Sequence, residues 1–340
     1  MGNNREVWVY IQRGKPDIRE ASLEILGKAC ELAEQLRATV AGVFLGTAPP
    51  AVLEKAFAFG AQKAYVLQSP CLDTYTSSPY AQAITWLVKQ KKPDIFLLAA
   101  TRQGRDLAPR VASALGAGLT ADCTDLQIGP YRDPKTNTAY RNILYQIRPA
   151  WGGNVIATIV SPLTRPQMAT VREGVMKLPE PRGACRGEVV ELDADLERES
   201  VQTRILESRH HEKAVDLKAA KIIVAGGAGM GSKENFLLIR QCAEVLGGEV
   251  GVTRAGVDAG FASEEYQIGQ TGTTVRPKLY IACGISGAVQ HVAGMDQSGK
   301  IIAINTDPEA PIFTIAHYGI IGDAAAVLPI LINAYKHLGR

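Results

Sequence analysis

Long hydrophobic runs are absent from the sequence, and its longest apolar stretches, such as residues 95–100, fall far short of a membrane-spanning helix, which needs ~20 residues. Charge of one sign is also lacking, because the formal net charge is only +3 and lysine and arginine form no cluster with interleaved aromatic residues. A dedicated nucleic-acid-binding protein is therefore not expected. Arg5 and Glu6 lead directly into an apolar stretch, without the basic and long apolar segments of a secretory signal. We expect a cytoplasmic protein without membrane insertion.

Cysteine is scarce, and no two cysteines form the C-x-x-C pair that is typical of zinc and iron–sulfur sites. We expect no metal centre and no catalytic triad, and we interpret all six cysteines as reduced, mostly buried thiols: Cys30, Cys71, Cys123, Cys185, Cys242 and Cys283.

What the sequence does contain is the composition of a globular protein, with 46% apolar and 21% charged residues over 340 positions. This length favours two domains, since a single core rarely serves so long a chain. In the first half, strand-like segments at 7–11, 39–45, 63–67 and 95–100 alternate with helical spacing around Leu23–Ala33 and 83–88. This alternation predicts a mostly parallel sheet covered by helices.

The pattern changes after Ile128, where a turn-rich stretch precedes strand-like residues 142–147 and 155–160, and we expect a β-ribbon there. Residues 178–200 are rich in proline and then in charge, which indicates a connector between domains. We therefore predict an N-terminal domain at 1–200 and a C-terminal domain at 201–340.

The C-terminal half opens with a strand at 221–225, the turn Gly226-Gly-Ala-Gly-Met-Gly-Ser232 and a helix at 233–246. Further buried strands are predicted at 279–283 and 300–304, each followed by small or polar residues, as in the ligand loops of a doubly wound sheet. A glycine turn of this kind lets the backbone approach a pyrophosphate. By itself the motif is weak, because it lacks the G-x-G-x-x-G spacing and an acidic ribose partner, and a simple tight turn explains it equally well.

Later polar turns carry more information, because together they provide many hydrogen-bonding groups for one large cofactor. They are Val252-Thr-Arg254-Ala, Gln267-Ile-Gly-Gln-Thr-Gly272, Gly284-Ile-Ser-Gly-Ala-Val-Gln-His291 and Ala303-Ile-Asn-Thr-Asp-Pro-Glu-Ala-Pro-Ile-Phe313. Their order resembles the FAD-binding half of electron transfer flavoprotein α (large) subunits. The first half is similar too, through Gly104-Arg-Asp-Leu-Ala-Pro-Arg110, Gly118-Leu-Thr-Ala-Asp-Cys123, Arg148-Pro-Ala-Trp-Gly-Gly-Asn154 and Arg165-Pro-Gln-Met-Ala-Thr-Val-Arg172.

The resemblance covers nearly the whole chain and implies its fold class, cofactor and partners. It implies an α/β protein with a nucleotide-hydrolase-like N-terminal layer packing on a β subunit and a doubly wound, FAD-binding C-terminal domain. The implied function is electron relay between NADH or acyl-CoA dehydrogenases and partner redox proteins, such as a ferredoxin or a quinone-linked reductase. Flavin-based electron bifurcation is one version, and the chain is expected to catalyse nothing alone.

The resemblance also implies which residues bind FAD. Arg254 matches the arginine over the flavin ring, Thr271 the hydroxyl donor to flavin N5, and His291 the histidine near the N1/O2 side. The remaining implied positions follow the rest of the flavin, the ribityl chain, the pyrophosphate and the adenosine: Thr253, Gln267, Gly269, Gln270, Gly272, Gly284, Ser286, Gly287, Gln290, Asn305, Asp307 and Asp323.

Each assignment has an ordinary structural alternative. Arg254 is also placed to form a surface ion pair, and His291 to be a hydrogen-bonded helix residue. Asn305 and Asp307 precede Pro308, where such residues often start a turn.

The sequence departs from the family pattern at three positions. Ala228 stands where an arginine is usual, Thr273 where a lysine is usual and His317 where an aspartate is usual. These departures change the charge near the proposed site, so the flavin potential is expected to differ from that of the housekeeping type.

Two other classes of protein are alternatives to this resemblance. One is a single-subunit dinucleotide-dependent enzyme of deoxyhypusine-synthase-like fold, for which no catalytic lysine or acid–base candidate is found. The other is a nucleotide-binding regulatory module, for which Gly104-Arg-Asp is too short a phosphate loop.

Overall fold

The computed structural model describes residues 5–14, 17–150, 155–183, 185–193, 207 and 215–338. The chain divides into two compact units, Met1–Glu207 and Ser208–Arg340. None of the helices in the described part of the chain has the length and hydropathy of a membrane span.

The N-terminal unit contains a seven-stranded parallel sheet with the strand order β10-β3-β2-β1-β4-β9-β5. The strands are β1 (Glu6–Tyr10), β2 (Thr39–Leu45), β3 (Lys63–Gln68), β4 (Ile95–Ala99), β5 (Leu119–Cys123), β9 (Gln167–Val171) and β10 (Glu188–Asp193). The helices are α1 (Glu20–Leu36), α2 (Pro50–Ala58), α3 (Ser77–Lys91) and α4 (Arg102–Leu115). Apolar residues of α1 and α2 belong to one buried cluster, and those of α3 and α4 to another. The sheet is therefore covered on both faces, as the near-continuous apolar strands predict.

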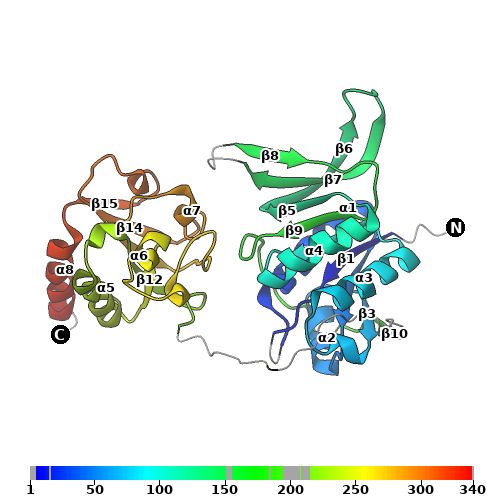
Figure 1. Ribbon diagram of the computed structural model, residues 1–340, viewed down its shortest axis with the longest axis horizontal. Coiled ribbons are helices and arrows are strands. Elements are labelled where there is room, and N and C mark those ends of the chain that lie inside the picture. The colour runs from blue at the N-terminus through cyan, green and yellow to red at the C-terminus, as the bar shows by residue number, and fades with distance from the viewer. Residues whose placement is uncertain are drawn as a thin grey trace. The chain divides into compact units, whose positions relative to one another are not determined.

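A three-stranded antiparallel sheet extends from this unit (Figure 1), formed by β6 (Asp125–Arg132), β7 (Ala139–Pro149) and β8 (Ile156–Ile159). It confirms the predicted β-ribbon. Its base is anchored to the main core through the buried side chains of Leu126 and Leu144, and the side-chain oxygen of Gln167 accepts a hydrogen bond from the Leu144 amide.

One expectation for this unit was wrong. Residues 188–193, predicted to be part of a connector, form the edge strand β10, which pairs in parallel with β3. Val190 and Leu192 pack against the α3/α4 core while charged residues alternate outward. A short edge strand with charged residues at its solvent-facing positions has the same composition as a linker. Only its pairing with β3 shows that this segment is a strand. Residues 184 and 194–200 of the predicted connector lie outside the described residues.

The C-terminal unit contains a five-stranded parallel sheet in the order β12-β11-β13-β14-β15. Its elements are β11 (Ile222–Gly226), α5 (Lys233–Leu246), β12 (Glu249–Val252), α6 (Arg254–Asp258), β13 (Leu279–Cys283), α7 (Val289–Val292), β14 (Lys300–Asn305), β15 (Tyr318–Ile321) and α8 (Ala324–Leu338). Helices α5 and α8 lie side by side over one face of the sheet (Figure 1). The other face is covered by segments that contribute Met295, Ala310 and Ile312, the last from a short 3-10 helix at Pro311–Thr314. Strand β12, which follows β11 in the chain, pairs with one side of β11, and the next strand, β13, pairs with its other side. The strand order therefore reverses between β11 and β13, which makes this the switch point of the sheet.

The cysteines of the described residues are free, as expected, but only Cys123, Cys242 and Cys283 are fully buried. Cys30, Cys71 and Cys185 are partly exposed, which corrects the expectation that most are buried.

Candidate functional site

A cavity of about 500 Å³ opens at the switch point of the C-terminal sheet. The loops after β11 and β13 form part of its lining, and the segments after β12 and β14 complete it. Ligands of open α/β sheets bind at this position because the loops diverge there. The lining residues are Gly227, Ala228, Gly229, Thr253, Arg254, Ala255, Asp258, Gln267, Ile268, Gly269, Thr271, Gly284, Ile285, Ser286, Ala288, Gln290, His291 and Asn305.

Two glycine loops meet at the floor of this cavity. The Gly229 amide donates a hydrogen bond to the Gly284 carbonyl oxygen at 2.9 Å. A Cβ atom on Gly227 would lie 2.3 Å from that same oxygen, closer than any side chain tolerates. Glycine is therefore required for the approach of the two backbones, and the turn after β11 does more than join a strand to a helix.

Arg254 is the cation of the cavity wall. Thr253 caps the short helix α6 by accepting a hydrogen bond from the Gly256 amide, and this places Arg254 at the helix start. The Arg254 guanidinium Nε donates to the Asp258 carboxylate at 2.9 Å, and both side chains remain well exposed, Arg254 at 64%. The ion pair foreseen as the alternative for Arg254 is thus present, on residues that also line the cavity.

His291 lines the cavity with only 6% of its surface exposed. Its ring nitrogens lie 3.0 Å from the Tyr280 hydroxyl and 3.0 Å from the Ile268 carbonyl oxygen. Because a carbonyl can only accept, Nδ1 carries the hydrogen and Nε2 accepts from Tyr280. Burial lowers the pKa of His291 to about 4, although the Ile268 carbonyl opposes this shift. At neutral pH the side chain is therefore uncharged, and both ring nitrogens have protein partners.

Gln267 and Thr271 form a second polar contact on the cavity wall. The Gln267 side chain belongs to a residue that is 1% exposed, and its Nε2 donates to Thr271 Oγ1 at 2.8 Å. The other end of the amide, Oε1, has no hydrogen-bond partner among the described residues. A buried acceptor without a partner is costly, which indicates that a donor from a ligand belongs there.

The structure brings ten of the fifteen expected site residues together around the cavity: Thr253, Arg254, Gln267, Gly269, Thr271, Gly284, Ser286, Gln290, His291 and Asn305. The other five do not line it. Gly272 and Gly287 instead allow close backbone contacts, the first against Gln267 and the second against Ile312.

The remaining three residues of those five have local roles on loops. Gln270 is exposed, and its amide donates to the Gln290 carbonyl. Asp307 accepts from the Glu309 amide and Asp323 from the Ala325 amide at the start of α8, as expected of residues that begin turns and helices. The same holds for Asn305, whose side chain accepts from the Asp307 amide while it lines the cavity.

Part of the cavity lining was not expected from the sequence. Asp258 could have been identified from the sequence, because it stands four residues after Arg254 on a helix, the spacing of an ion pair. Nothing in the sequence identifies Ile268, Ile285 and Ala288 as lining residues, because an apolar residue in a loop can face either the core or a cavity. Of the three departures from the family pattern, only Ala228 lines the cavity, and His317 accepts a hydrogen bond from the Ile301 amide.

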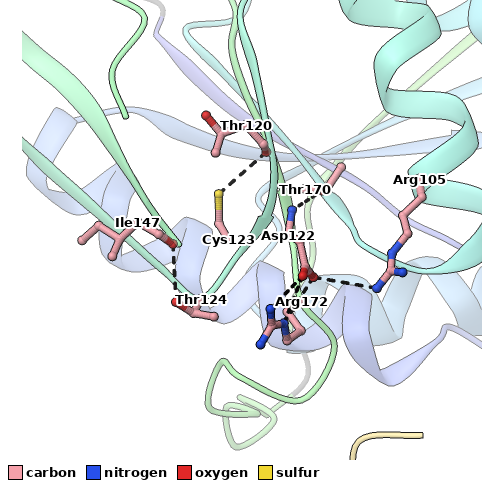
Figure 2. Close-up of polar contacts among 8 residues, drawn as sticks. All are labelled: Arg105, Thr120, Asp122, Cys123, Thr124, Ile147, Thr170 and Arg172. Carbon is pink, nitrogen blue, oxygen red and sulfur yellow. Dashed lines mark hydrogen bonds and ion pairs between the residues drawn. The ribbon is translucent and has the colours of Figure 1, made fainter. Parts of the chain in front are cut away.

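A separate polar cluster lies at the edge of the N-terminal sheet (Figure 2). Asp122 has a left-handed backbone with φ of 62°, and its carboxylate binds Arg172 at 2.7 Å and lies 3.8 Å from Arg105. Its amide donates to Thr170 Oγ1. These contacts join a bulge in β5 to the end of β9, so their role is structural. Within the described residues no group of His, Cys, Asp and Glu side chains could hold a metal ion.

Comparison with known proteins matches both units to family models. Residues 7–197 match the electron transfer flavoprotein domain, and residues 216–296 match the electron transfer flavoprotein FAD-binding domain. The chain is 46% identical to the electron transfer flavoprotein subunit alpha of Thermoanaerobacterium thermosaccharolyticum, over 99% of this chain and 100% of that protein. It is 44% identical to the subunit alpha of Megasphaera elsdenii, over 97% of this chain and 96% of that protein. It is 45% identical to the protein FixB of Clostridium saccharobutylicum, over 98% of this chain and 96% of that protein.

The cavity fits the cofactor that this match implies, since it combines a glycine floor, a cation and an unpartnered buried acceptor at a switch point. Fold and site therefore define a flavoprotein of the electron-transferring class, with FAD as its cofactor. The chain belongs to the electron transfer flavoprotein α subunit family. This membership decides against both alternatives, the dinucleotide-dependent enzyme and the nucleotide-binding regulatory module.

Proposed function

We propose that FAD occupies the cavity at the β11/β13 switch point, with its flavin ring beside Arg254, Thr271 and His291. Ser286, Gln290 and Asn305 would follow the ribityl chain and the diphosphate. One observation supports this placement: residues that are far apart in the sequence, from Thr253 to Asn305, come together around a single cavity, beside the two glycine loops. Such concave sites with a few placed polar groups are typical of cofactor binding.

The residues of the site would tune the cofactor and perform no acid–base chemistry of their own. Bound FAD supplies the chemistry by accepting and returning electrons. Arg254 brings a permanent positive charge that favours an electron-rich ring. His291 is neutral at physiological pH, so its part is packing and polarity. Asp258 offsets some of the Arg254 charge through their ion pair.

A cavity-filling variant tests the placement. Ala288 lines the cavity and is exposed toward it, so Ala288→Trp should abolish FAD binding, measured by the visible absorbance of the purified protein. Ala326 on α8 is exposed but does not line the cavity, and Ala326→Trp should keep the yellow colour. Full flavin content in Ala288→Trp would place the FAD elsewhere.

We also propose that the chain works as one half of a heterodimer with an electron transfer flavoprotein β subunit. Exposed apolar side chains on and beside the edge strand β8, including Val155, Ile156 at 70% exposure and Leu163 at 80%, support this idea. Such residues on an unpaired sheet edge are stabilised when a partner covers them.

Substitution on this edge tests the interface. Ile156→Lys should weaken co-purification of the β subunit, since it would place a charge in an apolar contact. Val189→Lys, at an exposed position of β10, should leave the heterodimer intact, because β10 and β5 are opposite edges of the seven-stranded sheet and β6 follows β5 in the chain. Equal loss in both variants would point to general destabilisation.

We propose the electron donors and acceptors from the resemblance to the electron transfer flavoprotein family. A cytoplasmic heterodimer would carry electrons between NADH or acyl-CoA dehydrogenases and partner redox proteins. The bifurcating version needs a second flavin in the β subunit, and the housekeeping version does not. The number of FAD molecules per heterodimer therefore distinguishes them: two with NADH oxidation support bifurcation, and one with no response to NADH supports the housekeeping carrier.

A further inference from the structure

Gln267 is a buried amide whose two ends have different surroundings. Nε2 donates to Thr271 Oγ1 at 2.8 Å, while Oε1 has no partner among the described residues, and both residues line the cavity. The backbone of Gln267 is fixed as well, because its carbonyl accepts from the Thr273 amide and its amide donates to the Glu264 carbonyl. The side chain therefore enters the cavity wall from an anchored position.

The contact has a consequence for the hydroxyl of Thr271. A hydroxyl oxygen that accepts a hydrogen bond still carries its own hydrogen, which is then free for another acceptor. With Gln267 Nε2 as its donor, Thr271 can offer this hydrogen toward the cavity. Rotation of the amide would reverse the arrangement, since Oε1 would then accept the hydroxyl hydrogen and Thr271 would face the cavity as an acceptor.

We propose that Gln267 is a positioning residue that holds the Thr271 hydroxyl as a hydrogen-bond donor to the bound flavin. The inference rests on the proposed placement of FAD, with Thr271 beside the flavin N5. The oxidised ring presents N5 as an acceptor, whereas the fully reduced ring carries a hydrogen there. A fixed donor therefore favours the oxidised ring and lowers the midpoint potential relative to a freely rotating hydroxyl.

Substitution by methionine, which has a similar shape, tests the proposal in the FAD-loaded heterodimer. Gln267→Met should weaken binding of oxidised FAD by about threefold to tenfold, the usual worth of one hydrogen bond. It should also raise the two-electron midpoint potential by up to about 30 mV, which corresponds to tenfold in the equilibrium. Gln297→Met, at an exposed position that does not line the cavity, is the matched control and should change neither value.

The decisive measurement is the coupling between the two residues. Thr271→Val removes the hydroxyl, so in that background Gln267→Met should cause no further shift of potential. Equal shifts in both backgrounds would show that Gln267 acts independently of Thr271, which overturns the inference. If Thr271→Val itself changes neither affinity nor potential, the placement of FAD beside Thr271 is wrong, and the proposed function fails at that point.

A second variant covers the case in which methionine disturbs folding. Gln267→Glu keeps the shape of the side chain. Its protonated carboxyl can donate to Thr271 as the amide does, but its carboxylate can only accept. FAD affinity should then fall as pH rises through the raised pKa expected of a buried carboxyl, and the wild type should show no such step. A step of the same size in Gln267→Glu/Thr271→Val would assign it to charge alone and overturn the inference.

Discussion

Asp122→Asn would remove a negative charge from the cluster at the edge of the N-terminal sheet while keeping the shape of the side chain. The side chains of Asp122 and Arg172 are 15% and 13% exposed, and the carboxylate contacts both Nε and Nη2 of the arginine. Asparagine also tolerates the left-handed backbone of this position, so the variant isolates the ion pair from backbone strain.

The expected loss follows from the burial of the pair. Removing one partner of a fully buried ion pair costs ~3–5 kcal/mol. Here Arg172 keeps some contact with solvent and asparagine retains one acceptor, so we expect about 2 kcal/mol. Asp122→Ala should lose ~1 kcal/mol more, since alanine disfavours the left-handed region.

The pH dependence of this contribution has a defined sign. Burial raises the pKa of Asp122, but the hydrogen bonds and charge of Arg172, with Arg105 and Arg148 nearby, outweigh it and hold the pKa below the usual 3.8. The stabilisation is therefore fully present above the unfolded value and is lost as pH falls through the lower folded value. The wild type and the variant should converge in stability only below about pH 4.

Hydrogen exchange of the heterodimer, followed by mass spectrometry, measures this effect locally. Peptides covering 119–123 and 167–171 should exchange roughly 30-fold faster in Asp122→Asn, the equivalent of about 2 kcal/mol. Asp73→Asn, at an exposed position of the same unit, should exchange like the wild type. Identical protection in both variants would refute the structural role assigned to the Asp122 cluster.

Three further predictions concern the C-terminal unit. Arg254→Ala should lower the flavin midpoint potential by roughly 40 mV, while Asp258→Asn should raise it by a similar amount; spectroelectrochemistry measures both, and shifts of the same sign would contradict the ion pair's role. Burial lowers the pKa of His291 from its ordinary 6.5 to about 4. The free energy of unfolding should therefore be highest above pH 6.5 and fall toward pH 4, by about 3 kcal/mol in total. Urea titrations at a series of pH values measure this fall, and His291→Gln should flatten it. Gly272→Ala should weaken FAD binding by roughly tenfold or more, because the new Cβ would lie 2.3 Å from a backbone oxygen of its own loop, whereas Gly183→Ala, with nothing within 4 Å, should bind FAD normally.

The strands that could be predicted are those with continuous apolar runs. The strands at 39–45 and 279–283 and the helix at 233–246 have the predicted bounds. Buried parallel strands and amphipathic helices are visible in a sequence because burial on both faces, or on one stripe, fixes their composition. The short edge strand β10 was mistaken for a connector, since half of its side chains face solvent.

The candidate site likewise has a part that the sequence identifies and a part that it does not. Polar residues on the loops after β12 and β13 were identified through their resemblance to a family, and the structure brings most of them to the cavity. What no pattern revealed is how the loop residues bond to one another: the amide of Gln267 donates to Thr271, and the imidazole of His291 is enclosed between Tyr280 and the Ile268 carbonyl. These contacts depend on loop conformation, which the spacing of residues does not encode.

The two sheets also differ at their switch points, and this has a consequence for the supply of flavin. Between β1 and β4, where an N-terminal ligand would bind, the buried side chains of Gln12 and Thr101 are joined by a hydrogen bond of 2.6 Å. The loops that follow β1 and β4 are therefore joined there by the protein's own side chains. The C-terminal half, with FAD bound as proposed, gains ~1.4 kcal/mol for each tenfold excess of cofactor. A shortage of flavin would therefore lower the stability of the C-terminal half, where the cofactor binds, and would not act at the N-terminal switch point.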